Sequence, residues 1–219
     1  MATLFKWLGI IVGALIIIVL IFAGFVYFKS SSILNTDYSG IRGMKIYVPD
    51  DSSTVAHGEH IARAWAGCVE CHGGNLGGMK VIEDMPFARL YGPNLTSGEG
   101  GLPADYTIEE FDRAVRHGVN RDGLGIWIMP SFHYCYLNDD DVAALFAYVK
   151  NLKPVNNTTP KFQLGPVGRM VLTMGGFPRA SAEYINHDKK PPAKPWKNWM
   201  CSKSPCPNTA RKANKPATD

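Results

Sequence analysis

A run of uncharged residues near the N-terminus restricts this chain more than any other feature. The 22 residues from Trp7 to Phe28 carry no charge. A helix of that length rises about 33 Å, which is enough to cross a hydrocarbon core of about 30 Å. A cleaved signal peptide is the alternative, but its apolar region is shorter, about 7–15 residues, and small residues follow it. Because this run ends in Tyr-Phe-Lys, we predict that residues 1–29 form an uncleaved transmembrane anchor.

The remaining residues divide by composition and charge. Residues 30–55 are polar and rich in turn formers, which predicts a linker. A domain is expected at 56–155, followed by an extended basic tail at 156–219. Residues 29–188 hold 14 Lys/Arg against 18 Asp/Glu, whereas residues 189–219 hold 8 against 1. This split excludes a uniformly basic nucleic-acid binder. The tail suits an acidic protein surface, anionic lipid head groups or simple solvation.

Local signals predict helices inside the domain. In YTIEEFDRAVRHG, Thr107 and Glu110 form a capping box, and Gly118 stands where the helix would end. In NDDDVAALFAYVKNLKP, Asn138 is an N-cap and Pro154 follows the end. A further helix is expected to lead into the cysteine motif at residues 68–72. Since no segment alternates like a strand, we predict a small all-α domain whose long loops surround something bulky.

The motif CVECH at residues 68–72 has four possible chemistries: a disulfide, a zinc half-site, a redox dithiol or a haem anchor. A structural zinc site usually needs a second C-x-x-C pair, and the sequence has none. A thioredoxin-like dithiol would follow a strand in a βαβ unit, and no such unit is visible. C-x-x-C-H is the attachment signature of c-type haem. We therefore expect Cys68 and Cys71 to bind one haem c covalently and His72 to ligate its iron.

A second axial ligand is expected from a loop downstream. Met129 precedes Pro130 between two predicted helices, and a thioether ligand favours Fe(II) and raises the reduction potential. Met85 also precedes a proline in a loop, but it lies only 13 residues after His72. His117 or His133 would instead give a bis-histidine site of lower potential. The preferred metal ligands are His72 and Met129.

The stretch from His57 to Val155 resembles a class I c-type cytochrome domain. More narrowly, it resembles the one-haem modules in the multi-haem cytochrome c subunits of membrane-bound alcohol, aldehyde and gluconate dehydrogenases. The matching segments, in order, are CVECHGG, GPNLTSGEGGL, IEEFDRAVRHGV, MP and DDDVAALFAYVKNLKPV. Fainter similarity continues through LGPVGRMVLTMGG and AEYINHD. Because no second C-x-x-C-H follows, we expect a one-haem class I cytochrome c domain preceded by a single transmembrane helix.

The resemblance implies roles for further residues. Pro93 is expected to accept a hydrogen bond from the His72 ring, which would orient the imidazole and raise its basicity. The other implied haem contacts are donors to a propionate, from Asn94, Thr96 and Arg116, and walls of the crevice, from Trp127 and Tyr136.

Three thiols remain beyond the haem motif: Cys135, Cys201 and Cys206. Haem attachment by this motif takes place outside the bacterial cytoplasm, where disulfides persist. A bridge between Cys201 and Cys206, or between Cys135 and either of them, is compatible with the sequence.

These features predict an electron carrier and not an enzyme. The protein would transfer single electrons between respiratory or dehydrogenase components on the periplasmic side of a bacterial inner membrane. Its redox partner would be a membrane dehydrogenase, a quinol-oxidising complex, an oxidase or a reaction centre. The alternatives are an accessory haem subunit of a larger respiratory or photosynthetic complex, or a haem peroxidase or ligand sensor.

Overall fold

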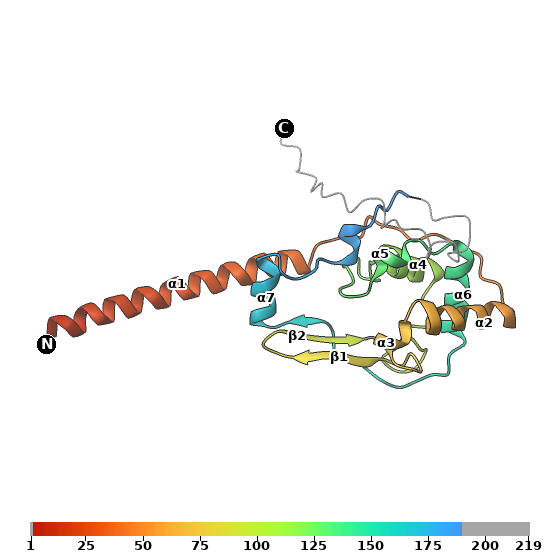
Figure 1. The fold of residues 1–219 in the computed structure, drawn as a ribbon, viewed down its shortest axis with the longest axis horizontal. Coiled ribbons are helices and arrows are strands. Elements are labelled where there is room, and N and C mark those ends of the chain that lie inside the picture. Colours follow the sequence, from red (N-terminus) through yellow and green to blue (C-terminus); the bar gives the residue numbers. More distant parts are fainter. Residues whose placement is uncertain (1, 190–219) are drawn as a thin grey trace.

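The computed structural model describes residues 2–189, and two features dominate it (Figure 1). One is the long helix α1 (Ala2–Leu34), which extends away from the remainder of the chain. The other is a domain in which helices lie on one side and a short sheet lies on the other. Most of the side chains of α1 up to Phe28 are exposed, and α1 is the one helix among residues 2–189 that is long and apolar enough to cross a membrane.

The helical layer is built around a close crossing of α2 (Ser52–His60) and α6 (Asp139–Lys150). Gly58 makes the crossing possible, because a Cβ atom there would lie 1.9 Å from the carbonyl oxygen of Ala144. Both helices begin with a side-chain cap. Asp51 accepts from the Thr54 N–H, and Asn138 caps α6 as the sequence predicts.

Helix α4 (Ile108–His117) confirms the predicted boundaries. Both halves of the Thr107–Glu110 capping box are present, and Gly118 ends the helix with φ 67°. Two short helices complete this layer: α5 (Ser131–Tyr134) and the 3₁₀ turn η2 (Ser181–Tyr184), which contact each other.

The segment leading into the cysteine motif is helical but interrupted. A π-helical turn, η1 (Ile61–Trp65), follows α2 directly, and the Ala66 N–H donates to the Ile61 carbonyl at 2.7 Å. Gly67 then adopts φ 62°, which a residue with a Cβ rarely does, and α3 (Cys68–His72) begins in a new direction. The break turns the motif away from the axis of α2.

The all-α prediction is incomplete, because the domain also contains a three-stranded antiparallel sheet. Strands β1 (Met79–Asp84) and β2 (Ala88–Gly92) form a hairpin, and β3 (Gln163–Leu164) pairs with β2. Only β2 alternates between buried and half-buried residues, whereas β1 is mostly exposed. The strands are held by pairing more than by burial, so they leave little periodic signal in the sequence.

The segment expected to be a linker, and the part of the expected tail up to residue 189, make contacts with the remainder of the described chain. Residues 37–44 run along it: Asp37 pairs with Leu124, and the Met44 N–H donates to buried Asp112 at 2.7 Å. Within 156–189, β3 completes the sheet and α7 (Pro166–Thr173) packs against α1.

Two apolar clusters hold the structure together. The larger one lies among α2, α4 and α6 and includes Ile61, Leu76, Phe111, Leu137, Val142 and Leu145. The smaller one joins α1 to the sheet and α7 and includes Ile33, Ala88, Leu164, Leu172 and Phe177.

Candidate haem site

The two cysteines of the motif lie one helical turn apart on α3, beside the larger apolar cluster. Cys68 packs against that cluster and is half-buried. Burial, followed by the neighbouring Cys71, raises the pKa of the Cys68 thiol to about 11. A redox-active dithiol needs the opposite shift, because the thiolate is the reactive form. The surroundings therefore disfavour the redox-dithiol reading of the motif.

His72 is oriented by the chain that follows β2. Its Nδ1 atom lies 2.8 Å from the carbonyl oxygen of Pro93. A carbonyl can only accept, so Nδ1 carries the proton and the lone pair of the neutral ring resides on Nε2. Burial lowers the pKa of His72, which favours this neutral form. The ring thus presents Nε2 as a metal ligand, with the backbone contact that the resemblance implies.

The position of Pro93 depends on a close backbone approach. A Cβ atom on Gly92 would lie 1.9 Å from the Cys71 carbonyl oxygen. Only glycine allows the end of β2 to lie directly against α3. The sheet that the sequence did not predict therefore places the acceptor for His72.

Asn94 and Thr96 are buried, but their polar atoms are engaged within the protein. The Asn94 amide donates to the carbonyl of Val155 at 2.7 Å, and its oxygen accepts from the N–H and the hydroxyl of Thr96 at 2.9 and 2.8 Å. Longer contacts from the same amide reach the carbonyls of Glu99 and Asn157 at 3.4 and 3.3 Å. The expectation that these two residues donate to a haem propionate is not supported, because they fasten the 94–101 loop to residues 155–157.

Met129 lies in a loop whose backbone is strained and tightly held. Ile128, immediately before it, has φ 71°, an unfavourable conformation for a β-branched residue. The Met129 carbonyl accepts from the Ser131 N–H at 2.9 Å and from the hydroxyl of Ser181. Strain that the surroundings enforce is typical of functional loops. The Met129 side chain packs against the same apolar cluster as Cys68.

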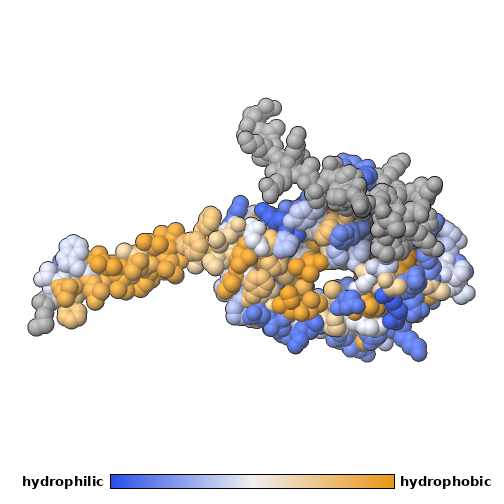
Figure 2. Space-filling model, in the orientation of Figure 1, coloured by the Kyte–Doolittle hydropathy of each residue, from blue (hydrophilic) through white to orange (hydrophobic). Residues whose placement is uncertain are grey.

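The domain is hollowed between its two layers. Figure 2 shows the hollow, and comparison with Figure 1 places it between the layer of α4 and α5 and the layer of α3 and the hairpin. This arrangement suits a covalently attached haem. It provides two thiols on one helical turn, an imidazole with its Nε2 available, a loop that carries a thioether, and a hollow between the layers. The residues present therefore fit that group.

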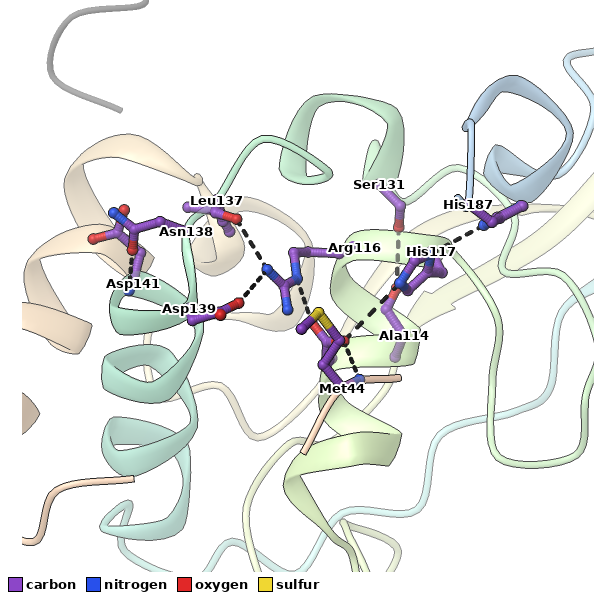
Figure 3. A network of polar contacts seen from close by, with 11 residues as sticks. Met44, Ala114, Arg116, His117, Ser131, Leu137, Asn138, Asp139, Asp141 and His187 are labelled. Atoms are coloured by element: carbon purple, nitrogen blue, oxygen red, sulfur yellow. Dashed lines mark hydrogen bonds and ion pairs between the residues drawn. The ribbon is translucent and has the colours of Figure 1, made fainter. Parts of the chain in front are cut away.

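Arg116 forms part of a buried ionic network (Figure 3). It is 2% exposed, and its Nε pairs with Asp112, which is fully buried. Its Nη1 donates to Asp139 at 2.8 Å and to the Leu137 carbonyl at 3.3 Å. Among the described residues its Nη2 has no partner. The network joins α4 to the start of α6 and, through the Met44 N–H on Asp112, to the chain that leaves α1. All three of the contacts that Arg116 makes, with Asp112, Asp139 and the Leu137 carbonyl, are made within the fold.

Trp127 and Tyr136, which were expected to form walls of the haem crevice, lie in two different parts of the structure. Trp127 belongs to the smaller apolar cluster, where it stacks on Phe162 with ring centroids 5.8 Å apart. Tyr136 is half-buried, and the Lys189 ammonium lies 5.9 Å from its ring centroid. Cys201 and Cys206 lie outside the described residues, so the pairing of the three remaining thiols stays open.

His117 and His133, the alternative ligands to Met129, each contact another side chain. His117 Nδ1 lies 3.0 Å from Nδ1 of His187, a partner that the sequence did not suggest (Figure 3). His133 is exposed and packs against Phe132. The pairing of His117 with His187 makes it a poor candidate for the iron.

Sequence reasoning missed Ser181 and His187, which approach the Met129 loop and α4 from more than 50 residues away. The faint similarity of AEYINHD to the cytochrome subunits was the only signal that this segment belongs to the domain.

Comparison with known proteins gives the domain a family. Residues 53–149 match the model of a family described as cytochrome C oxidase, cbb3-type, subunit III. The chain is 36% identical over 118 residues to the fructose dehydrogenase cytochrome subunit of Gluconobacter japonicus, covering 51% of this chain and 24% of that protein. It is also 36% identical over 104 residues to the gluconate 2-dehydrogenase cytochrome c subunit of Pantoea cypripedii, covering 45% and 23%.

A third relative is the cytochrome c subunit of the alcohol dehydrogenase (quinone) of Gluconobacter oxydans, 30% identical over 112 residues. That match covers 48% of this chain and 23% of the relative. The chain thus spans about a quarter of the length of each of these relatives. Similarity of this kind over the segment that carries the cysteine motif, His72 and Met129 implies haem c. Residues 53–149 of this chain form a c-type cytochrome domain.

Proposed function

We propose that this protein is a membrane-anchored electron carrier with one haem c, bound through Cys68 and Cys71 and ligated by His72 and Met129. The haem would supply a one-electron couple between Fe(III) and Fe(II). The observation that carries the proposal is the contact between His72 Nδ1 and the Pro93 carbonyl, which leaves Nε2 as the ligand atom. The strained loop at Ile128 supports Met129 as the second ligand.

The protein's own residues would control the couple in two ways. The Pro93 carbonyl would fix the imidazole and raise its basicity, which favours Fe(III). The Met129 thioether would favour Fe(II) and raise the potential. Because His72 and Met129 would both ligate the iron, the haem would supply one-electron transfer, and the protein would leave no ligand position for peroxide or a sensed gas.

The location and partner follow from α1 and from the relatives. α1 supports an uncleaved anchor in a bacterial inner membrane, and attachment of haem c requires that the domain lie on the periplasmic side. The relatives are cytochrome subunits of fructose, gluconate and alcohol dehydrogenases. The favoured partner is therefore a membrane dehydrogenase, with a quinol-oxidising complex, an oxidase or a reaction centre as alternatives.

Intact-mass spectrometry tests the cofactor. The chain, expressed with a working haem-maturation system, should gain the mass of one haem, and the double variant Cys68→Ala, Cys71→Ala should gain none. Two haems on the wild type, or none, would refute the proposal.

A pair of methionine variants tests the second ligand. Met129→Ala should remove the weak absorption band near 700 nm that the resemblance implies for methionine-ligated haem, and it should lower the potential. Met85→Ala is the control, since Met85 also precedes a proline but is 41% exposed at the turn between β1 and β2. Loss of the band in Met85→Ala with retention in Met129→Ala would show that the assignment is wrong.

A further inference from the structure

Helix α7 packs against the last turns of α1, and a cationic side chain joins the two. Arg169 Nη1 donates to the hydroxyl oxygens of Ser30 and Ser31 at 2.9 and 3.0 Å. The same guanidinium lies 4.9 Å from the ring centroid of Tyr27. Ser30 is fully buried, and Ile33 packs in one cluster with Leu172 of α7. The domain is therefore attached to α1 by packed side chains and not only by a linker.

The contact lies at the level where the uncharged run of α1 ends. Val26 and Ile33 are the outermost buried apolar residues of α1 in this contact, and they are separated by about 10 Å along the helix. Phe28 is the last residue of the uncharged run. If α1 spans a membrane, α7 must lie at the boundary between the acyl chains and the head groups, which is several ångströms thick on each side.

The free face of α7 is apolar. Val167, Met170 and Met174 follow one another at spacings of three and four residues, so they lie on one side of the helix. They are 44%, 37% and 76% exposed. Inside the helix, Gly168 and Leu172 are buried. An apolar stripe at helical spacing normally faces a core, and this one is accessible.

The turn of the β hairpin extends this surface. The Val167 N–H donates to the Pro86 carbonyl at 2.8 Å, which places the turn beside the start of α7. Met85 in that turn is 41% exposed. Figure 1 shows that α7 and the hairpin turn form the edge of the domain from which α1 departs, and Figure 2 shows hydrophobic surface continuing from α1 onto this edge.

We propose that α7 and the hairpin turn insert into the interfacial layer of the lipid bilayer, with Met85, Val167, Met170 and Met174 in contact with lipid. This inference rests on the proposed anchoring by α1. Lipid is the favoured occupant because this surface is continuous with the lipid-facing side of α1 and lies at the same level as Tyr27 and Phe28.

The charged residues near α7 and the hairpin turn are compatible with both anionic and zwitterionic lipids. Lys29 is exposed at the end of the apolar run, while Asp84 lies next to the hairpin turn. Because both signs are present, apolar contact and not attraction to anionic lipid would hold the edge in place. The consequence is a haem domain with a fixed height and tilt on the membrane, so that its redox partner must present its own centre close to the membrane plane.

The methionines of the chain allow a direct test. The full, haem-loaded protein would be labelled with ¹³C at the methionine methyl groups and placed in phosphatidylcholine nanodiscs, with the iron reduced to its diamagnetic low-spin state. One sample carries a lipid with a nitroxide near the head of its acyl chain, and another carries a water-soluble gadolinium chelate. Single Met→Leu variants assign the signals.

Matched controls exist in the same molecule. Met44 and Met79 are 42% and 39% exposed, close to the values for Met85 and Met170, but they lie beside α4 and at the start of β1, away from this edge. The nitroxide lipid should remove most of the intensity of the Met85, Met170 and Met174 signals. The chelate should instead broaden Met44 and Met79.

Two failures would be distinguishable. A chain that does not co-elute with nanodiscs would refute the anchor and with it this inference. A chain that stays with the nanodiscs while Met170 and Met174 respond like Met44, to the chelate and not to the lipid, would refute the interfacial contact and leave the anchor intact.

Discussion

Replacement of Asn94 by alanine is expected to lower the free energy of unfolding by about 3 kcal/mol, a figure built from its contacts. Asn94 is 1% exposed. The change would remove two hydrogen bonds of the Asn94 side chain. One goes to the Val155 carbonyl at 2.7 Å, and the other comes from the Thr96 N–H at 2.9 Å. Each buried polar group left unpaired costs about 1–3 kcal/mol, and relaxation of the loop would recover part of that cost.

A matched control is available in the same pair of segments. Asn156 is exposed, and its side-chain oxygen accepts from the Glu99 N–H at 3.0 Å. Because water can replace this contact, Asn156→Ala should cost less than about 1 kcal/mol. Denaturant unfolding of the haem-loaded protein, followed by helical circular dichroism, would compare both variants, and an unchanged slope would show that the difference is one of stability.

Two results would refute the reasoning. Equal, small losses in both variants would show that the Asn94 network contributes little. An Asn94→Ala protein of normal stability whose reduction potential and its pH dependence have changed would instead show that Asn94 acts on a haem propionate, as the resemblance implied and the geometry did not support.

Two further perturbations test the crossing of α2 with α6 and the histidine pair. Gly58→Ala should lower the free energy of unfolding by roughly 1–3 kcal/mol or prevent folding, because the new Cβ would lie 1.9 Å from the Ala144 carbonyl oxygen. Gly74→Ala is the control, since a Cβ atom there would have nothing within 4 Å. It should be close to neutral in the same unfolding assay. Burial is the main cause that lowers the pKa values of His117 and His187 in the folded protein. Below the ordinary histidine pKa of about 6.5, the unfolded chain therefore binds more protons than the folded chain. The stability that the neutral pair contributes is lost as the pH falls through this range. Unfolding midpoints between pH 7.5 and 5.5 should fall less in His187→Gln than in the wild type, and an equal fall would contradict this account.

The sequence alone determined the features whose signals are local. The C-x-x-C-H motif, the capping box at Thr107 and the cap at Asn138 each occupy a few consecutive residues, and the structure has both caps where they were predicted. The apolar run of α1 is equally local. Such features depend on bond geometry and on neighbours one helical turn away, so composition and spacing are enough to reveal them.

The tertiary structure decided which residues that are distant in the sequence contact one another. Asn94 bonds to Val155 across 61 residues, Ser181 bonds to the Met129 carbonyl across 52, and Arg169 bonds to Ser30 across 139. The sheet that brings Pro93 to His72 likewise depends on pairing between strands and not on a periodic pattern within them. A buried donor takes whichever acceptor the packing brings near it, because leaving it unpaired is costly, and that choice is fixed only when distant segments meet.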